Sequence, residues 1–213
     1  MTIHWSLFVP GVLLLLYPAD RLLSSLVELR SFDCFQNLEN SPRYRPWWWV
    51  LSLWLDPLRG FLGTLLLMQA LAPATVRWAL APKLEYALLV VVVAAGVVCQ
   101  TFTRRGDTGV LLAPIGFVAG AVAALTPWPV ALIGIVTGAL GLCAFRQFHA
   151  FFAFGLAAVS LLGLVLGAGM MWIAPAVGVF ALPIVVGLVT SSTLELPTRN
   201  ASGPPPMPLP KKI

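Results

Sequence analysis

The sequence predicts an all-α protein, a polytopic transmembrane helix bundle with six or seven crossings. Of its 213 residues, 59% are hydrophobic and only 10% are charged, whereas soluble domains carry about 25% charged residues. A spanning helix needs ~20 apolar residues, and a soluble core would not bury the longest charge-free runs of this chain. These runs lie at 60–76, 86–103, 108–145 and 147–194.

Residues 1–45 are predicted to form an N-terminal region of their own. The first apolar run, 5–19, contains Pro10 and is short for a crossing. If this run crosses the membrane, the protein has seven helices; if it does not, it has six. Residues 21–29 carry apolar and polar side chains on opposite faces, as a helix lying on the membrane surface does. A polar loop, 31–45, follows.

The transmembrane bundle is predicted over residues 46–192. Two prolines that bracket Trp128 interrupt the run 108–145, and Pro175 interrupts the run 147–194, because proline does not continue a helix. We therefore expect two crossings in each of these runs. The predicted crossings are 46–71, 86–102, 108–125, 130–145, 150–172 and 175–192.

Residues 193–213 are predicted to be a disordered, proline-rich cytoplasmic tail. Six of the last 17 residues are prolines, a composition that favours an extended, solvated chain over a packed one.

The basic residues predict the orientation of the chain. Cytoplasmic loops of membrane proteins are rich in Lys and Arg, and alternate loops here divide these residues ten to two. The C-terminus is therefore predicted to be cytoplasmic. The excess of Arg over Lys indicates a GC-rich bacterial genome, and we expect the protein in the bacterial inner membrane. The ten are Arg21, Arg30, Arg43, Arg45, Arg104, Arg105, Arg146, Arg199, Lys211 and Lys212, and the two are Arg77 and Lys83.

Asp56 and Arg59 interrupt an otherwise apolar segment and allow two interpretations. They could form an intramembrane ion pair, because charged residues inside a bilayer are costly and usually functional. Alternatively, Asp56 could be the N-cap of a helix that begins at Pro57, since Asp is favoured at that position and Pro at the next. Arg59 would then reach water at the membrane interface. We favour the cap.

Five polar residues are predicted to lie at the cytoplasmic face, where they are candidate contacts for an anion or a lipid. The plainer alternative is that they set the topology and cap helices. They are Arg104, Arg105, Asp107, Arg146 and His149.

Glycines and prolines inside the predicted crossings indicate how the helices pack together and where they bend or break. Glycines four residues apart let helices approach closely in lipid, either within the bundle or against a partner. The three pairs are Gly116 with Gly120, Gly134 with Gly138, and Gly163 with Gly167. Pro114 and Pro183 are predicted to kink their helices, or to break them around a binding site as in some transporters.

No motif in the chain assigns a reaction. Sequence patterns typical of metalloproteases, serine hydrolases and nucleotide-binding enzymes are absent, and we predict no metal site, no cofactor and no nucleic acid. We expect contact with the lipid bilayer and with membrane-protein partners or a second copy. The leading hypothesis is a non-catalytic structural or accessory subunit of an envelope complex. The alternatives are a small transporter or channel with a site near Asp56 and Arg59, and an enzyme that acts on lipid.

Overall fold

The computed structural model describes seven segments of the chain, residues 3–17, 27–30, 51–71, 83–102, 111–167, 170–191 and 194–199. Seven helices form most of this part of the protein. They are α1 (Trp5–Leu16), α4 (Leu51–Leu71), α5 (Lys83–Thr101), α6 (Ile115–Leu125), α7 (Trp128–Phe145), α8 (Phe148–Val165) and α9 (Met170–Thr190). Three short strands accompany them, β1 (Val27–Arg30), β2 (Leu111–Leu112) and β3 (Leu194–Arg199).

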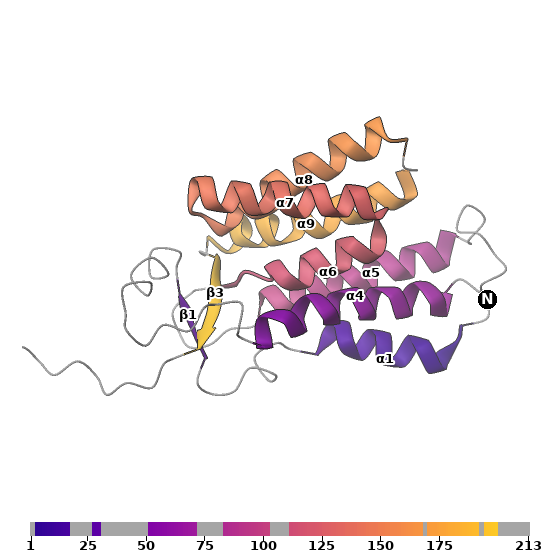
Figure 1. The fold of residues 1–213 in the computed structure, drawn as a ribbon. Helices are drawn as coiled ribbons and strands as arrows, with labels where there is room; N and C mark the ends of the chain where they lie inside the picture. The colour runs from indigo at the N-terminus through magenta and orange to yellow at the C-terminus, as the bar shows by residue number, and fades with distance from the viewer. Residues whose placement is uncertain are drawn as a thin grey trace, which may run out of the picture.

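The helices lie side by side and alternate in direction along the chain (Figure 1). The predicted helical fold class is confirmed, and the strands add a small sheet at one end of the bundle, in the order β1-β3-β2. We call this the sheet end. Three connecting segments run between helix ends that all lie at the sheet end. These segments are 18–50, 103–110 and 146–147.

Within the described segments, three helices, rather than six or seven, are long and apolar enough to cross a membrane. They are α7, α8 and the Ile173–Thr190 part of α9. The prediction failed because α1 and α6, with 12 and 11 residues, are only ~16–18 Å long, well short of the ~30 Å hydrocarbon core. In α4, Asp56 and Arg59 interrupt the apolar sequence.

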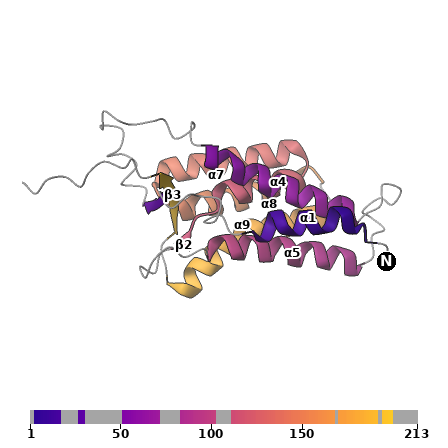
Figure 2. The ribbon, with the colours of Figure 1, turned by 90° about the horizontal axis from the view of Figure 1, so that it is seen from below.

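In the first half of the bundle, α4 is the central helix (Figure 2). It packs between α1 and α6. The N–H of His4, just before α1, donates to the carbonyl oxygen of Ala70 near the end of α4, with 3.1 Å between nitrogen and oxygen. This bond joins the two antiparallel helices at the end opposite the sheet.

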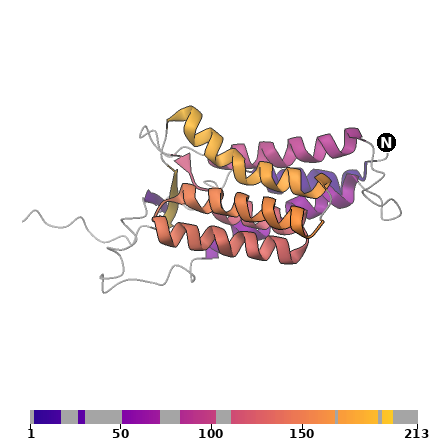
Figure 3. The same ribbon diagram turned by 90° about the horizontal axis from the view of Figure 1, so that it is seen from above.

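In the second half, α8 lies between α7 and α9 (Figure 3). Helix α9 also packs against α5 and α6, which joins the two halves. Within the second half, the rings of Phe151 on α8 and Phe180 on α9 are 6.0 Å apart, and both side chains are buried.

Two predicted segments form strands instead. Val27–Arg30 is β1, so the predicted surface helix over 21–29 is wrong for its last three residues. Leu194–Arg199 is β3, so the predicted disorder over 193–213 is wrong for these six residues. The reason is tertiary: β3 pairs with β1 in antiparallel fashion and with β2 in parallel fashion. The rest of the predicted tail lies outside the described residues.

The predicted boundary at residues 126–129 is confirmed, because α6 ends at Leu125 and α7 begins at Trp128. The predicted boundary at Pro175 is wrong, since this proline lies inside α9. Helix α8 ends earlier, at a turn where Gly167 has a φ of 62°. Glycine adopts this left-handed conformation without a steric penalty, and the chain therefore turns there.

Candidate functional site

Asp56 and Arg59 both lie inside α4, which runs without interruption from Leu51 to Leu71. The N-cap interpretation of Asp56 is therefore wrong, and Pro57 occupies a position inside the helix. Proline there removes one backbone hydrogen bond, yet the helix continues because tertiary packing supports it. The two charged residues are consequently held on successive turns of a continuous helix.

Glycines bring α6 into direct contact with this part of α4. A Cβ atom added at Gly120 would overlap the carbonyl oxygen of Pro57, and one at Gly116 would lie 2.8 Å from the Pro57 ring carbon Cδ. A Cβ atom added at Gly60 of α4 would overlap the carbonyl oxygen of Phe117. Only glycine fits at these positions, so the two backbones approach as closely as small residues allow in membrane helices.

Arg59 is buried inside the bundle, with 6% of its side chain exposed. Its Nη1 lies 3.9 Å from Oδ1 of Asp56, whose side chain is 20% exposed. This distance is too long for a hydrogen bond, so the two side chains attract each other only electrostatically. The guanidinium carbon is 5.7 Å from the centre of the Phe117 ring, within range of a cation–π interaction.

The nitrogen atoms of Arg59 are otherwise unsatisfied. Nε, Nη1 and Nη2 are all buried and have no hydrogen-bond partner among the described residues. A buried donor without a partner costs about 1–3 kcal/mol, and more when it is charged. Folded proteins rarely leave such groups unpaired, so each one calls for an explanation. A bound anion would provide one.

Phe117 and Gln100 complete the surroundings of this region, and the sequence analysis missed both. A Cβ atom at Gly96 of α5 would lie 3.3 Å from the tip of the Phe117 ring. One turn further along α5, the Gln100 side-chain nitrogen donates to the carbonyl oxygens of Leu15 and Tyr17, at 3.1 and 2.8 Å. A glutamine within a valine-rich segment was the only available signal. These contacts join α5 to α6 through Phe117, which lies against Arg59, and to α1 through Gln100.

The predicted cytoplasmic cluster is only partly described. Arg146 is exposed between α7 and α8, in the left-handed conformation with a φ of 55°, and His149 lies in the first turn of α8. Both residues belong to the second half of the bundle, away from α4. The other three members, Arg104, Arg105 and Asp107, lie outside the described residues.

The predicted glycine pairs lie mostly at contacts within the bundle. Gly116 and Gly120 face α4, and Gly134 and Gly138 face Val159 and Phe151 of α8. Gly163 faces Ile173 of α9. Gly167 is the exception, since a Cβ atom there would meet nothing within 4 Å. Three helix contacts, α4 with α6, α7 with α8 and α8 with α9, therefore depend on small residues.

The two predicted kinks have different outcomes. Pro183 lies inside α9. Pro114 is the residue before α6 and not part of a helix, so the prediction of a kink inside a helix is wrong there. Residues 111–114 are instead extended or irregular, and α6 begins abruptly beside Pro57. The start of a short helix therefore lies next to the charged pair of α4.

The described residues bring no three metal-ligating side chains together. Comparisons of the chain with protein-family models, with curated proteins and with solved structures found no match.

Proposed function

We propose that the protein is a bacterial inner-membrane protein whose whole helical bundle is embedded in the bilayer. Helices α7, α8 and α9 are long and apolar enough to cross it, and α7 alone is ~27 Å long. The shorter helix α6 packs against α4, α7 and α9, whereas α1 packs against α4 and α5 at the edge of the bundle. Their polar ends are covered by neighbouring helices or by water, as membrane proteins require.

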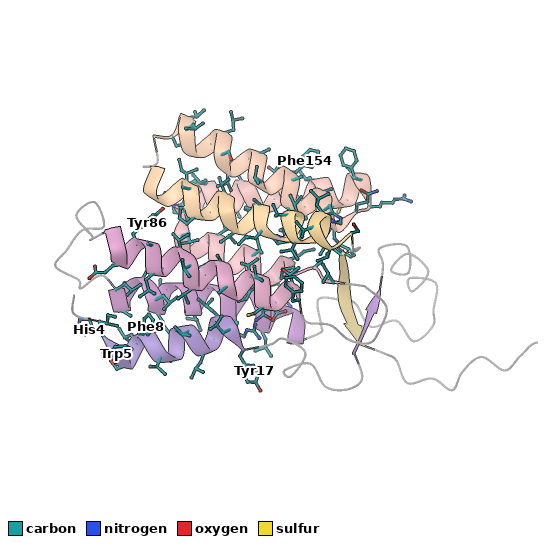
Figure 4. All side chains as sticks on the ribbon, turned by 180° about the vertical axis from the view of Figure 1, so that it is seen from behind. His4, Trp5, Phe8, Tyr17, Tyr86 and Phe154 are labelled. Atoms are coloured by element: carbon teal, nitrogen blue, oxygen red, sulfur yellow. The ribbon has the colours of Figure 1, made fainter. Side chains whose placement is uncertain are left out.

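Exposed aromatic side chains at both ends of the bundle support this placement. Trp and Tyr are enriched where a membrane meets water. Trp5 lies at the end of the bundle opposite the sheet, and Tyr17 lies at the other end of α1 (Figure 4). Aromatic residues that are at least 40% exposed also flank several other helices. These are Trp54, Phe102, Trp128 and Phe145.

The charge distribution supports a cytoplasmic sheet end. The segments 18–50, 103–110, 146–147 and 192–213 contain the ten basic residues of the majority group, and each adjoins a helix end at the sheet end (Figure 1). Cytoplasmic segments are the more basic ones. We therefore place the C-terminus in the cytoplasm and the start of α1 outside it.

Within this membrane protein, we propose a site that binds and transports a polar small molecule at Asp56 and Arg59. The observation that carries this proposal is the buried guanidinium of Arg59, which lacks hydrogen-bond partners in the part of the chain that the structure describes. Ionisable residues inside a membrane bundle mark substrate and ion pathways in many transporters. Helices interrupted at membrane depth also accompany such sites, and α6 begins beside this one.

The accessory-subunit hypothesis receives less support. It invoked three surfaces, the glycine-rich helix faces, the tryptophan-rich segment around residues 47–54 and the C-terminal tail. For the first of these, five of the six glycines in the predicted pairs lie against helices of the same chain. It remains a prediction, and so does the lipid-acting enzyme. Of the five polar residues predicted at the cytoplasmic face, Arg104, Arg105 and Asp107 are outside the described part of the chain.

Flux measurements in liposomes test the transport proposal. The purified protein is reconstituted and supplied in turn with labelled amino acids, sugars, carboxylates and phosphate esters. We expect uptake of at least one class above that of empty liposomes. Arg59→Gln should reduce this uptake at least tenfold, because the substitution removes the charge that contacts the substrate.

Arg77→Gln is the matched control, since it makes the same chemical change in the segment between α4 and α5. It should transport at the unmodified rate. If correctly incorporated protein transports none of the four classes, the transport proposal is wrong. Copurification of a stoichiometric partner protein in mild detergent would then favour the accessory subunit.

A further inference from the structure

Two sources of positive potential meet where α6 begins. One is the buried guanidinium of Arg59, and the other is the N-terminus of α6, which carries about half a positive charge. Pro57, two residues before Arg59, touches the first turn of α6 at Gly116. Phe117, the third residue of α6, lies against the guanidinium, 5.7 Å from ring centre to carbon.

The first turn of α6 contains backbone N–H donors that are not used by hydrogen bonds within the helix. The N–H of Ile115 donates to Ala113, and that of Val118 donates to Pro114, both at 2.9 Å between nitrogen and oxygen. The N–H groups of Gly116 and Phe117 have no acceptor within the helix itself, as at the start of any helix. Backbone N–H groups at a helix N-terminus readily bind anions.

The guanidinium also has unused donors, and the nearest carboxylate does not satisfy them. Arginine carries five N–H donors in a planar fork. Its three nitrogens lack a hydrogen-bond partner here, and Asp56 is 3.9 Å away. The face of the Phe117 ring attracts the positive charge of the guanidinium. It accepts no hydrogen bond from the guanidinium N–H groups, which point outward in the plane of that group. This arrangement matches an oxyanion with two oxygens, such as a carboxylate or a phosphate.

From this juxtaposition we infer that the ligand of the proposed transport site is an oxyanion. Its oxygens are held by Arg59 and by the first turn of α6. The inference rests on the proposed function for the location of the site and adds the chemical class of the ligand. Asp56 then competes with the oxyanion for Arg59, because its carboxylate attracts the same guanidinium while the site is empty.

Thermal unfolding of the full chain in detergent tests this inference. Acetate and inorganic phosphate are the soluble probes, and chloride at equal ionic strength is the reference. A ligand that binds only the folded protein raises its Tm as its concentration increases. We expect such a rise with acetate or phosphate, and none with chloride, since chloride cannot form two parallel hydrogen bonds with the fork.

Substitutions at the two charged residues should change the apparent affinity in opposite directions. Arg59→Gln should weaken it at least tenfold, and Arg59→Lys should weaken it less, because the charge remains while the fork is lost. Asp56→Asn should strengthen it several-fold by removing the competing charge. Each variant is first checked for an unmodified elution volume, and Arg77→Gln serves as the control.

A second arm distinguishes a soluble oxyanion from a lipid headgroup. The same unfolding measurement is made with phosphatidylglycerol added to the micelles and no soluble probe. A rise in Tm that only the lipid produces and that Arg59→Gln abolishes assigns the site to an anionic headgroup. A rise that acetate or phosphate produces alone assigns it to a soluble ligand. Either result supports the oxyanion class.

The inference is overturned if no probe raises the Tm, or if Arg59→Gln responds as the unmodified protein does. These outcomes are separate from those of the flux experiment. Oxyanion binding without flux would leave the site in place and contradict transport. Flux that is insensitive to oxyanions, from protein whose Tm does not respond to them, would leave transport in place and contradict the ligand class.

Discussion

The two halves of the bundle differ in what lies between their helices. Among the described residues, all six buried polar or charged side chains belong to the first half, α1 to α6, and to the turn that follows α6. They are Arg59, Thr64, Glu85, Gln100, Thr101 and Thr126. The described parts of α7, α8 and α9 meet through glycines, valines and phenylalanines. The first half therefore contains buried polar groups that require a specific hydrogen-bonding or charged partner, whereas the helices of the second half associate through close packing alone.

This difference separates two ways of holding membrane helices together. Close packing and interhelical hydrogen bonds both contribute in lipid, and here they are distributed unevenly. Buried polar groups lower the free energy of unfolding unless they are paired. Keeping them therefore reduces the stability of the first half. We attribute the cost to the binding site around Arg59, and the three predictions below test the contrast from the largest effect to the smallest.

Gly120→Ala should produce the largest effect, a loss of about 3 kcal/mol or more in the free energy of unfolding. The new methyl group would overlap the Pro57 carbonyl oxygen, and overpacking against backbone leaves little room for relaxation. Unfolding in mixed micelles by titration with sodium dodecyl sulfate measures the change.

Gly178→Ala in α9 is the matched control. A Cβ atom there meets nothing within 4 Å, so the substitution should be neutral or should stabilise the helix by up to about 1 kcal/mol. Equal losses at both positions would contradict the close contact of α4 and α6.

Val136→Arg should be the next largest effect, because it tests whether the apolar exterior of the second half faces lipid. Val136 is 48% exposed near the middle of α7. An arginine at the centre of a lipid-facing helix costs about 2.5–3.5 kcal/mol, and we expect membrane integration, measured by carbonate extraction, to fall. Ala144→Arg, close to the end of the same helix, should change little. Normal integration of both variants would indicate that α7 does not face lipid.

Gln100→Leu should have the smallest of the three effects, a loss of about 1–3 kcal/mol. It removes the two hydrogen bonds that the amide donates to Leu15 and Tyr17 and leaves both acceptors in an apolar setting. The same unfolding titration applies. Thr101→Val is the control, since the Thr101 hydroxyl donates only to Val97 of its own helix in the described contacts. A loss no larger than that of the control would show that the amide does not link α5 to α1.

The second half of the bundle was largely predictable from the sequence. Long apolar runs identify helices by length and composition, and the prolines around Trp128 separate α6 from α7. The exception is the boundary between α8 and α9. The glycine of that turn, Gly167, is one of many in an apolar run, and the more conspicuous Pro175 lies inside α9.

The first half was harder to predict because tertiary contacts override its local signals. Asp56 followed by Pro57 is a strong N-cap pattern, yet α4 continues through both residues. Its proline packs against glycines of α6 that lie about 60 residues away in the sequence. Asp56 and Arg59 stand out in the sequence because they are charged residues in an apolar segment, whereas Phe117 carries no signal that distinguishes it from other apolar residues.

The link between α7 and α8 has a consequence for the order in which the protein assembles. Only Arg146 and Gln147 separate these two helices, so their contacts join residues that are near neighbours along the chain. Local contacts form fast, because little loop entropy is lost in closing them. The contact of α4 with α6 must close a much longer loop. The α7–α8 hairpin should therefore form as soon as it is synthesised, as a preassembled surface on which α9 and the earlier helices complete the bundle.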